Sequence, residues 1–120
     1  MKSFADNIEK LTKDNQYYRK VLYTVPNSGS FQLVLMRLEP GEEIGSETHP
    51  DTTQFIRVEK GRGSAQLGRR KVPIRDGSAI VIPPGMRHNV TNTSRRSPLL
   101  LYTIYTPSEL PPHQRQRYKK

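Results

Sequence analysis

The chain has no cysteine among its 120 residues. This absence excludes disulfides, thiolate metal ligands and cysteine nucleophiles, so any bound metal must be held by imidazole, carboxylate or amide groups. Long apolar runs are also absent, and the longest, at 99–104, falls far short of the roughly 20 residues that a membrane span requires. Residues 1–6 carry no apolar signal core. We therefore expect a cytoplasmic protein that is not anchored in a membrane.

Acidic residues are few, with 11 Asp and Glu against 20 Lys and Arg, which gives a formal net charge of +9. Such an excess is typical of proteins that meet polyanions or acidic surfaces. The basic residues cluster at 69–71, 95–96 and 115–120. Solvated loops are the simpler interpretation, because neither aromatic stacking platforms nor a reading helix accompany these clusters. Nucleic acid or another polyanion is kept as a secondary partner.

Hydrophobic residues make up 32% of the chain and gather into short runs, which favours one folded domain over disorder. Phe4, Ile8 and Leu11 stand at helical spacing and predict a short helix within 1–16, with Ser3 and Asp6 as a weak cap. Short β-branched or aromatic segments, separated by turn residues, follow at 17–25, 31–38, 53–59, 64–68, 71–74, 78–82, 88–92 and 99–106. They predict an all-β antiparallel sandwich or barrel over 17–107. Residues 108–120 are expected to form a flexible basic tail that runs over the surface.

Two histidines lie in the middle of the predicted β domain, and Glu47 precedes His49 by two residues. Positions 47 and 49 share one face of an extended strand, so a carboxylate oxygen and an imidazole nitrogen can converge on one ion. Gln54 begins the next strand, and His88 follows a Pro-Pro-Gly bend. Glu47, His49 and His88 are thus predicted to form a two-histidine, one-carboxylate metal site, with Gln54 as a weaker neutral ligand. Burying these groups without a partner is costly, and the alternative to a metal is a barrel held by their mutual hydrogen bonds.

The spacing of these residues resembles the two motifs of the cupin superfamily. The spacing of the first motif is matched by Gly41, Glu47, His49, Gln54 and Gly61. Two residue types differ from the usual motif: Glu47 stands at the position of its first histidine, and Gln54 at the position of its glutamate. The second motif is met in full by Gly77, Pro83, Gly85, His88 and Asn92. The chain is similar in particular to the small single-domain type-2 cupins labelled mannose-6-phosphate isomerase-like. This resemblance implies a small jelly-roll β-barrel, a bound divalent metal ion and a homodimer that pairs its barrels edge to edge.

Fe, Mn, Ni, Co and Zn all suit the expected ligand set. With Glu47 ionised, a divalent ion leaves a net charge that attracts a small anionic or hydroxylated ligand, such as a sugar acid. By comparison with the small cupins that open unsaturated sugar acids, the resemblance implies that Tyr105 and Thr103 are catalytic candidates. The expected activity is a metal-dependent, isomerase-like conversion of a carbohydrate or small anion. A metal-dependent dioxygenase, or a non-catalytic ligand-binding barrel with a polyanion-binding tail, are the alternatives.

Overall fold

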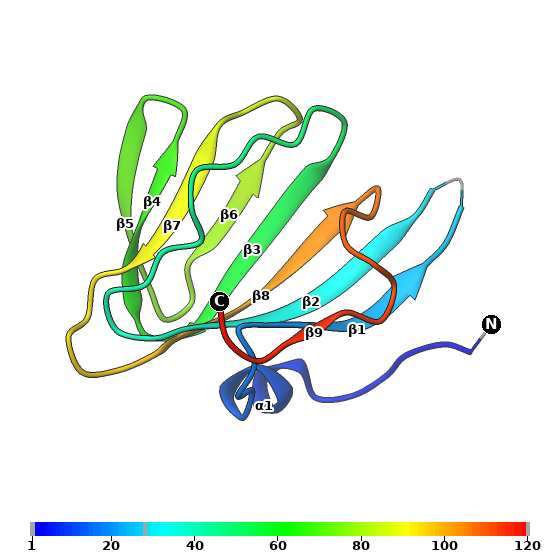
Figure 1. Cartoon of the computed structure of the whole chain (residues 1–120), viewed down its shortest axis with the longest axis horizontal. Coiled ribbons are helices and arrows are strands. Elements are labelled where there is room, and N and C mark those ends of the chain that lie inside the picture. Colours follow the sequence, from blue (N-terminus) through cyan, green and yellow to red (C-terminus); the bar gives the residue numbers. More distant parts are fainter. Residues whose placement is uncertain (1, 28, 120) are drawn as a thin grey trace.

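The computed structural model describes residues 2–27 and 29–119 as two antiparallel sheets and one short helix. The elements are α1 (Ile8–Lys13), β1 (Arg19–Val25), β2 (Phe31–Leu38), β3 (Thr53–Lys60), β4 (Arg62–Leu67), β5 (Arg70–Arg75), β6 (Ala79–Ile82), β7 (His88–Asn92), β8 (Leu99–Thr106) and β9 (Arg115–Gln116). The larger sheet has the order β6-β3-β8-β2-β1-β9, and the smaller has the order β5-β4-β7 (Figure 1). The predicted all-β jelly-roll class is confirmed, although hydrogen bonds between described residues do not join the two sheets into a closed barrel.

The core lies between the two sheets because their strands alternate buried and more exposed residues. In β3, Gln54, Ile56 and Val58 are buried while their neighbours are partly exposed. Ala65 of β4 and Val90 of β7 face these residues from the smaller sheet and belong to the same buried cluster. Period-two alternation places every second side chain on one face of a strand, so polar residues at inward positions of β3 and β8 are carried into the barrel.

The smaller sheet depends on a close approach between β4 and β7. Gly63 lies opposite Asn92 in the ladder, and a Cβ at Gly63 would collide with the backbone oxygen of Thr91 and lie 3.1 Å from Cδ2 of Leu99. No residue with a side chain fits this position without displacing backbone. The glycine therefore sets how tightly the two strands pack beneath Leu99.

The helix is shorter than predicted and begins at a different cap. The Asn7 side chain accepts a hydrogen bond from the Lys10 amide at 2.9 Å, so α1 starts after Asn7. Asparagine is among the strongest N-cap residues, and the cap predicted at Ser3 was wrong. Phe4 precedes the helix and packs its ring against that of Tyr23 at a centroid distance of 5.9 Å. The helix itself packs across β2, β3 and β8. The described residues contain no helix long and apolar enough to span a membrane.

The C-terminal segment runs over the surface and is more closely packed than its polar composition indicated. It adds β9 to the edge of β1, where Arg19 pairs with Gln116 and Lys20 with Arg115. Upstream of β9, the buried Gln32 side chain hydrogen-bonds the backbone at 109–110, and Leu110 packs against the core. The segment thus covers backbone groups of β1 that would otherwise form an open sheet edge.

Candidate metal centre

The backbone brings Glu47, His49 and His88 to one end of the sheets, where β3 and β7 begin. Glu47 and His88 exchange two backbone hydrogen bonds of 2.9 Å, which tie the segment before β3 to the first residue of β7. The amide of Gly85 donates to the carbonyl of His49 at 2.8 Å and fixes the neighbouring turn. As a result, the ligand atoms of Glu47, His49 and His88 all lie within 4.8 Å of one another.

Three buried side-chain atoms at this centre have no hydrogen-bond partner among residues 2–27 and 29–119: His49 Nε2, His88 Nε2 and Gln54 Oε1. His88 Nδ1 lies 3.0 Å from the backbone oxygen of Met86. Because a carbonyl only accepts, Nδ1 carries the proton, and the Nε2 lone pair of His88 is left free. Buried polar atoms are nearly always satisfied, so two imidazole nitrogens and an amide oxygen without partners fit the donor set of a divalent cation. The fold thus brings together a histidine and glutamate cluster that is compatible with a divalent metal ion.

The orientation of the Gln54 amide follows from its neighbour on β8. The Thr103 hydroxyl donates its single proton to the backbone oxygen of Phe55 at 2.9 Å, and so can only accept from Gln54. Gln54 Nε2 fills that role at 3.0 Å, which leaves Oε1 as the free end of the amide. Thr103 was predicted as a catalytic residue. Because its hydroxyl proton is already donated to the Phe55 carbonyl, a role in orienting Gln54 is favoured.

Tyr105 packs beside the two histidines. Its ring meets that of His49 edge-on at a centroid distance of 5.6 Å, and it lies opposite Gln54 in the ladder between β3 and β8. Burial raises the pKa of the Tyr105 phenol well above its usual range, the Arg19 guanidinium lowers it in part, and the Glu47 carboxylate raises it further. The phenol therefore stays protonated and available as a hydrogen-bond donor.

Glu109 is a site residue that the sequence analysis missed, because it lies in the segment read as a tail. Its Oε1 lies 3.5 Å from Nδ1 of His49, and its side chain is 28% exposed. The position is held by Gln32, whose Oε1 accepts from the amides of Glu109 and Leu110 at 3.0 and 2.9 Å. One signal was available: Glu109 is the single acidic residue in 108–120, directly after the last predicted strand.

Arg19 was also missed. It lies opposite Met36 in the ladder between β1 and β2, and directly opposed residues of an antiparallel pair share one face, which here is the core face. Its Nε is buried without a partner in the described chain, and its guanidinium carbon lies 5.2 Å from the Tyr18 ring centre. Its guanidinium lies near enough to Tyr105 to lower the pKa of that phenol in part.

Comparison with known proteins agrees with this fold. The chain is 44% identical over 116 residues to the uncharacterized protein YrkC of Bacillus subtilis, covering 92% of this chain and 60% of YrkC. It is 45% identical over 112 residues to the uncharacterized protein L612 of Acanthamoeba polyphaga mimivirus, covering 91% of this chain and 68% of L612. The crystal structure of BH2720 from Bacillus halodurans superposes with a TM-score of 0.92 at 41% identity, covering 98% and 91% of the two chains. Residues 34–105 match the family model of the cupin domain, and the chain belongs to the cupin family.

Proposed function

We propose that this cupin is a metal-dependent enzyme that converts a small anionic substrate of the sugar-acid or 2-oxo-acid class by an isomerase-like reaction. The observation that carries the proposal is the set of three buried ligand atoms without hydrogen-bond partners, on His49, His88 and Gln54. In a metal-free barrel held by mutual hydrogen bonds, each of these atoms would have a protein partner. Within the described residues none of them has one, and the Glu47 carboxylate oxygen lies 3.7 Å from His49 Nε2, beyond hydrogen-bond distance.

Glu47, His49, His88 and Gln54 would hold the ion, which we expect to be Fe, Mn, Ni, Co or Zn. A bound divalent ion supplies Lewis-acid chemistry and polarises a substrate carbonyl or hydroxyl. Thr103 keeps the Gln54 oxygen free for this role because it occupies the amide nitrogen. Glu109 would favour the matching tautomer of His49, because its carboxylate oxygen lies 3.5 Å from Nδ1 and attracts a proton on that side of the ring.

The substrate class follows from Arg19 and Tyr105. Arg19 presents a cation on the core face without an ion pair among the described residues, and a substrate carboxylate would provide that pair. Tyr105 remains protonated, so its phenol can donate a hydrogen bond to the substrate oxygen on which charge develops. Together these groups orient an anionic substrate and stabilise negative charge at a neighbouring oxygen.

The test is a screen of metal-loaded protein against sugar acids and 2-oxo acids, followed by NMR for exchange of carbon-bound hydrogen in deuterated water. For any substrate found, Tyr105→Phe should lower kcat by about 100-fold or more. Tyr102→Phe is the matched control, because Tyr102 lies on the other face of β8 and packs against Phe55. Full turnover by Tyr105→Phe would remove Tyr105 from the mechanism, and no exchange with any substrate would contradict the isomerase-like proposal.

A dioxygenase is the second candidate, and the observation that favours it is the composition of the cluster. Two histidines and one carboxylate form the ligand set of many non-haem iron oxygenases, which leave positions open for oxygen and substrate. Oxygen uptake by iron-loaded protein, measured with the same substrates, distinguishes the two reactions. Uptake without hydrogen exchange would select the dioxygenase.

A further inference from the structure

A basic cavity lies at the opposite end of the sheets from the metal centre. Its volume is about 770 Å³, and its walls come from the ends of β3, β5 and β7 and the starts of β4 and β8. Figure 1 shows the connection from β7 to β8, in yellow to orange, at the end of the molecule away from the start of β3. The volume of this cavity falls in the range of small-molecule binding sites.

The residues that line this cavity carry a large excess of positive charge. Its basic residues are Lys60, Arg62, Arg75, Arg95 and Arg96, and its single acidic residue is Asp76. The carboxylate of Asp76 already accepts the backbone amide of Gly61 at 2.8 Å. Within the part of the chain that the structure describes, none of the five cations forms an ion pair. The formal excess is therefore four positive charges around one hollow.

The loop that carries Arg95 and Arg96 is held by hydrogen bonds with the side chains of Asn92 and Ser94. Buried Asn92 donates from Nδ2 to the backbone oxygens of Leu38 and Ser97 at 3.0 and 2.9 Å, and its Oδ1 accepts from the Ser94 amide. Ser94 Oγ in turn accepts from the amides of Arg96 and Ser97 at 3.1 Å each. This frame fixes the backbone that carries the two arginines before any ligand arrives, which lowers the cost of ordering the loop on binding.

We propose that this cavity, here called the basic cavity, binds a small anion with several phosphate groups. Guanidinium groups bind phosphate oxygens in bidentate pairs, and the exposed hydroxyls of Thr93 and Ser97 add donors. A ligand with three or four negative charges matches the excess of positive charge, whereas a single carboxylate does not. Pro98 and the buried Leu100 provide an apolar wall beside the charges.

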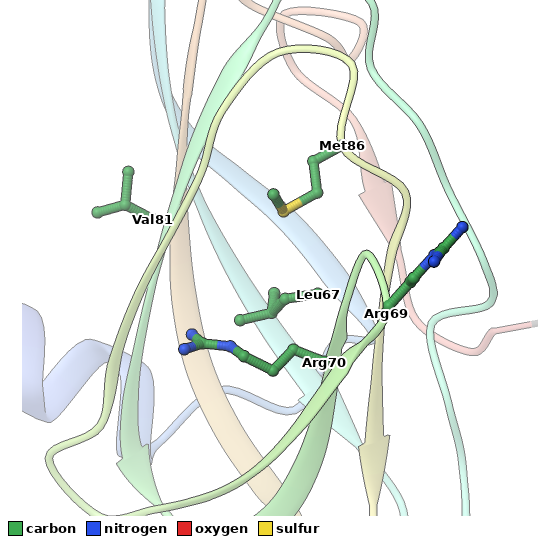
Figure 2. A pocket seen from close by; sticks show the side chains of 5 residues that line it. All are labelled: Leu67, Arg69, Arg70, Val81 and Met86. Atoms are coloured by element: carbon green, nitrogen blue, oxygen red, sulfur yellow. The ribbon is translucent and has the colours of Figure 1, made fainter.

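A second basic cluster, at the turn between β4 and β5, provides the control. Figure 2 shows Arg69 and Arg70 extending in opposite directions beside Leu67, Val81 and Met86, so they do not converge on one anion. Both arginines are exposed, as are Arg95 and Arg96. Removing either pair lowers the net charge of the protein equally.

The test is calorimetric titration of the chelator-treated protein with tripolyphosphate. We expect saturable binding that Arg95→Ala/Arg96→Ala weakens by at least about tenfold and that Arg69→Ala/Arg70→Ala changes by less than about threefold. Equal weakening in both double variants would mean attraction by net charge alone and would overturn the proposal, as would the absence of saturable binding. If a DNA duplex bound more tightly than tripolyphosphate, and both double variants lost that binding equally, the proposal would also be overturned. A general polyanion-binding surface would then be the better explanation. Unchanged thermal midpoints show that both variants fold.

Discussion

Gln54 and Thr103 are joined by a 3.0 Å hydrogen bond in which the amide nitrogen donates to a hydroxyl whose own proton is already committed to Phe55. This bond selects one of the two possible orientations of the Gln54 amide. Gln54 stands where cupins usually carry a glutamate, and the bond leaves its amide oxygen free and with a defined direction. We therefore propose that the Thr103 hydroxyl orients the Gln54 amide rather than transferring a proton to substrate.

Replacing Thr103 by valine keeps the shape of the side chain and removes that hydroxyl. We expect Thr103→Val to lower the free energy of unfolding by about 1–3 kcal/mol, because Gln54 Nε2 and the Phe55 carbonyl lose a buried partner. Metal affinity should fall by about 10–100-fold because the amide is no longer held. Thr103→Ser restores the hydroxyl and should recover most of the metal affinity. If valine and serine bound metal equally well, the orienting role would be wrong.

Glu109 should act on metal binding through His49. We expect Glu109→Ala to weaken metal affinity by about 10–100-fold, because the carboxylate beside Nδ1 no longer fixes the ring and its tautomer. Glu109→Gln keeps an oxygen acceptor and should lie between alanine and wild type. Asp51→Ala removes an exposed carboxylate from the same end of the molecule and is the control for charge. Metal affinity is measured by competition titration with a metal indicator. If Glu109→Ala and Asp51→Ala lowered this affinity equally, Glu109 would not position His49.

The buried Gln32 is expected to control the same histidine from a greater distance. Gln32→Leu removes the acceptor of the Glu109 and Leu110 amides and the donor to the Leu110 carbonyl. We expect faster proteolytic cleavage within 107–112, together with a loss of metal affinity similar to that of Glu109→Ala. Mass spectrometry of the fragments locates the cleavage. If Gln32→Leu resisted the protease and bound metal as well as wild type does, Gln32 would not hold residues 107–112 in place.

Gly63 tests the packing between the two strands of the smaller sheet. Gly63→Ala should lower the free energy of unfolding by about 1–3 kcal/mol, since the added methyl collides with the backbone of Thr91. Ser64→Ala, at the next position of β4, should stay within about 0.5 kcal/mol of wild type. Urea unfolding followed by circular dichroism measures both, and equal stability of the two variants would contradict the close approach.

Much of the fold could be predicted because it rests on local signals. Turn residues separate the strands. The predicted convergence of Glu47, His49 and His88 is reproduced, although Glu47 lies in an isolated bridge and His49 in the connection between β2 and β3 rather than on a strand. The predicted helix cap was wrong for a local reason: asparagine and serine are comparable N-cap residues, and Asn7 stands directly before Ile8, where the helix begins.

The remaining site residues depend on long-range contacts that no local pattern encodes. Glu109 reaches His49 because Gln32, far away in sequence, binds the chain after β8. Arg19 belongs to the core face only through its register with Met36, and β1 has a register shift after Val21 that disturbs simple alternation. The basic cavity likewise combines residues of separate turns, so the sequence showed only its Arg95 and Arg96 pair.

The most direct test of the metal centre is elemental analysis of untagged protein, combined with thermal unfolding before and after chelation. Wild type and His113→Ala, which changes an exposed histidine outside the centre, should each hold about one equivalent of a divalent metal. Saturating metal should raise Tm by several degrees, because ligand at about 100 times its Kd adds about 2.7 kcal/mol to stability. His49→Ala should lose both the metal and the shift in Tm. Metal-free wild-type protein that shows no shift with any of the five candidate ions would contradict the metal centre.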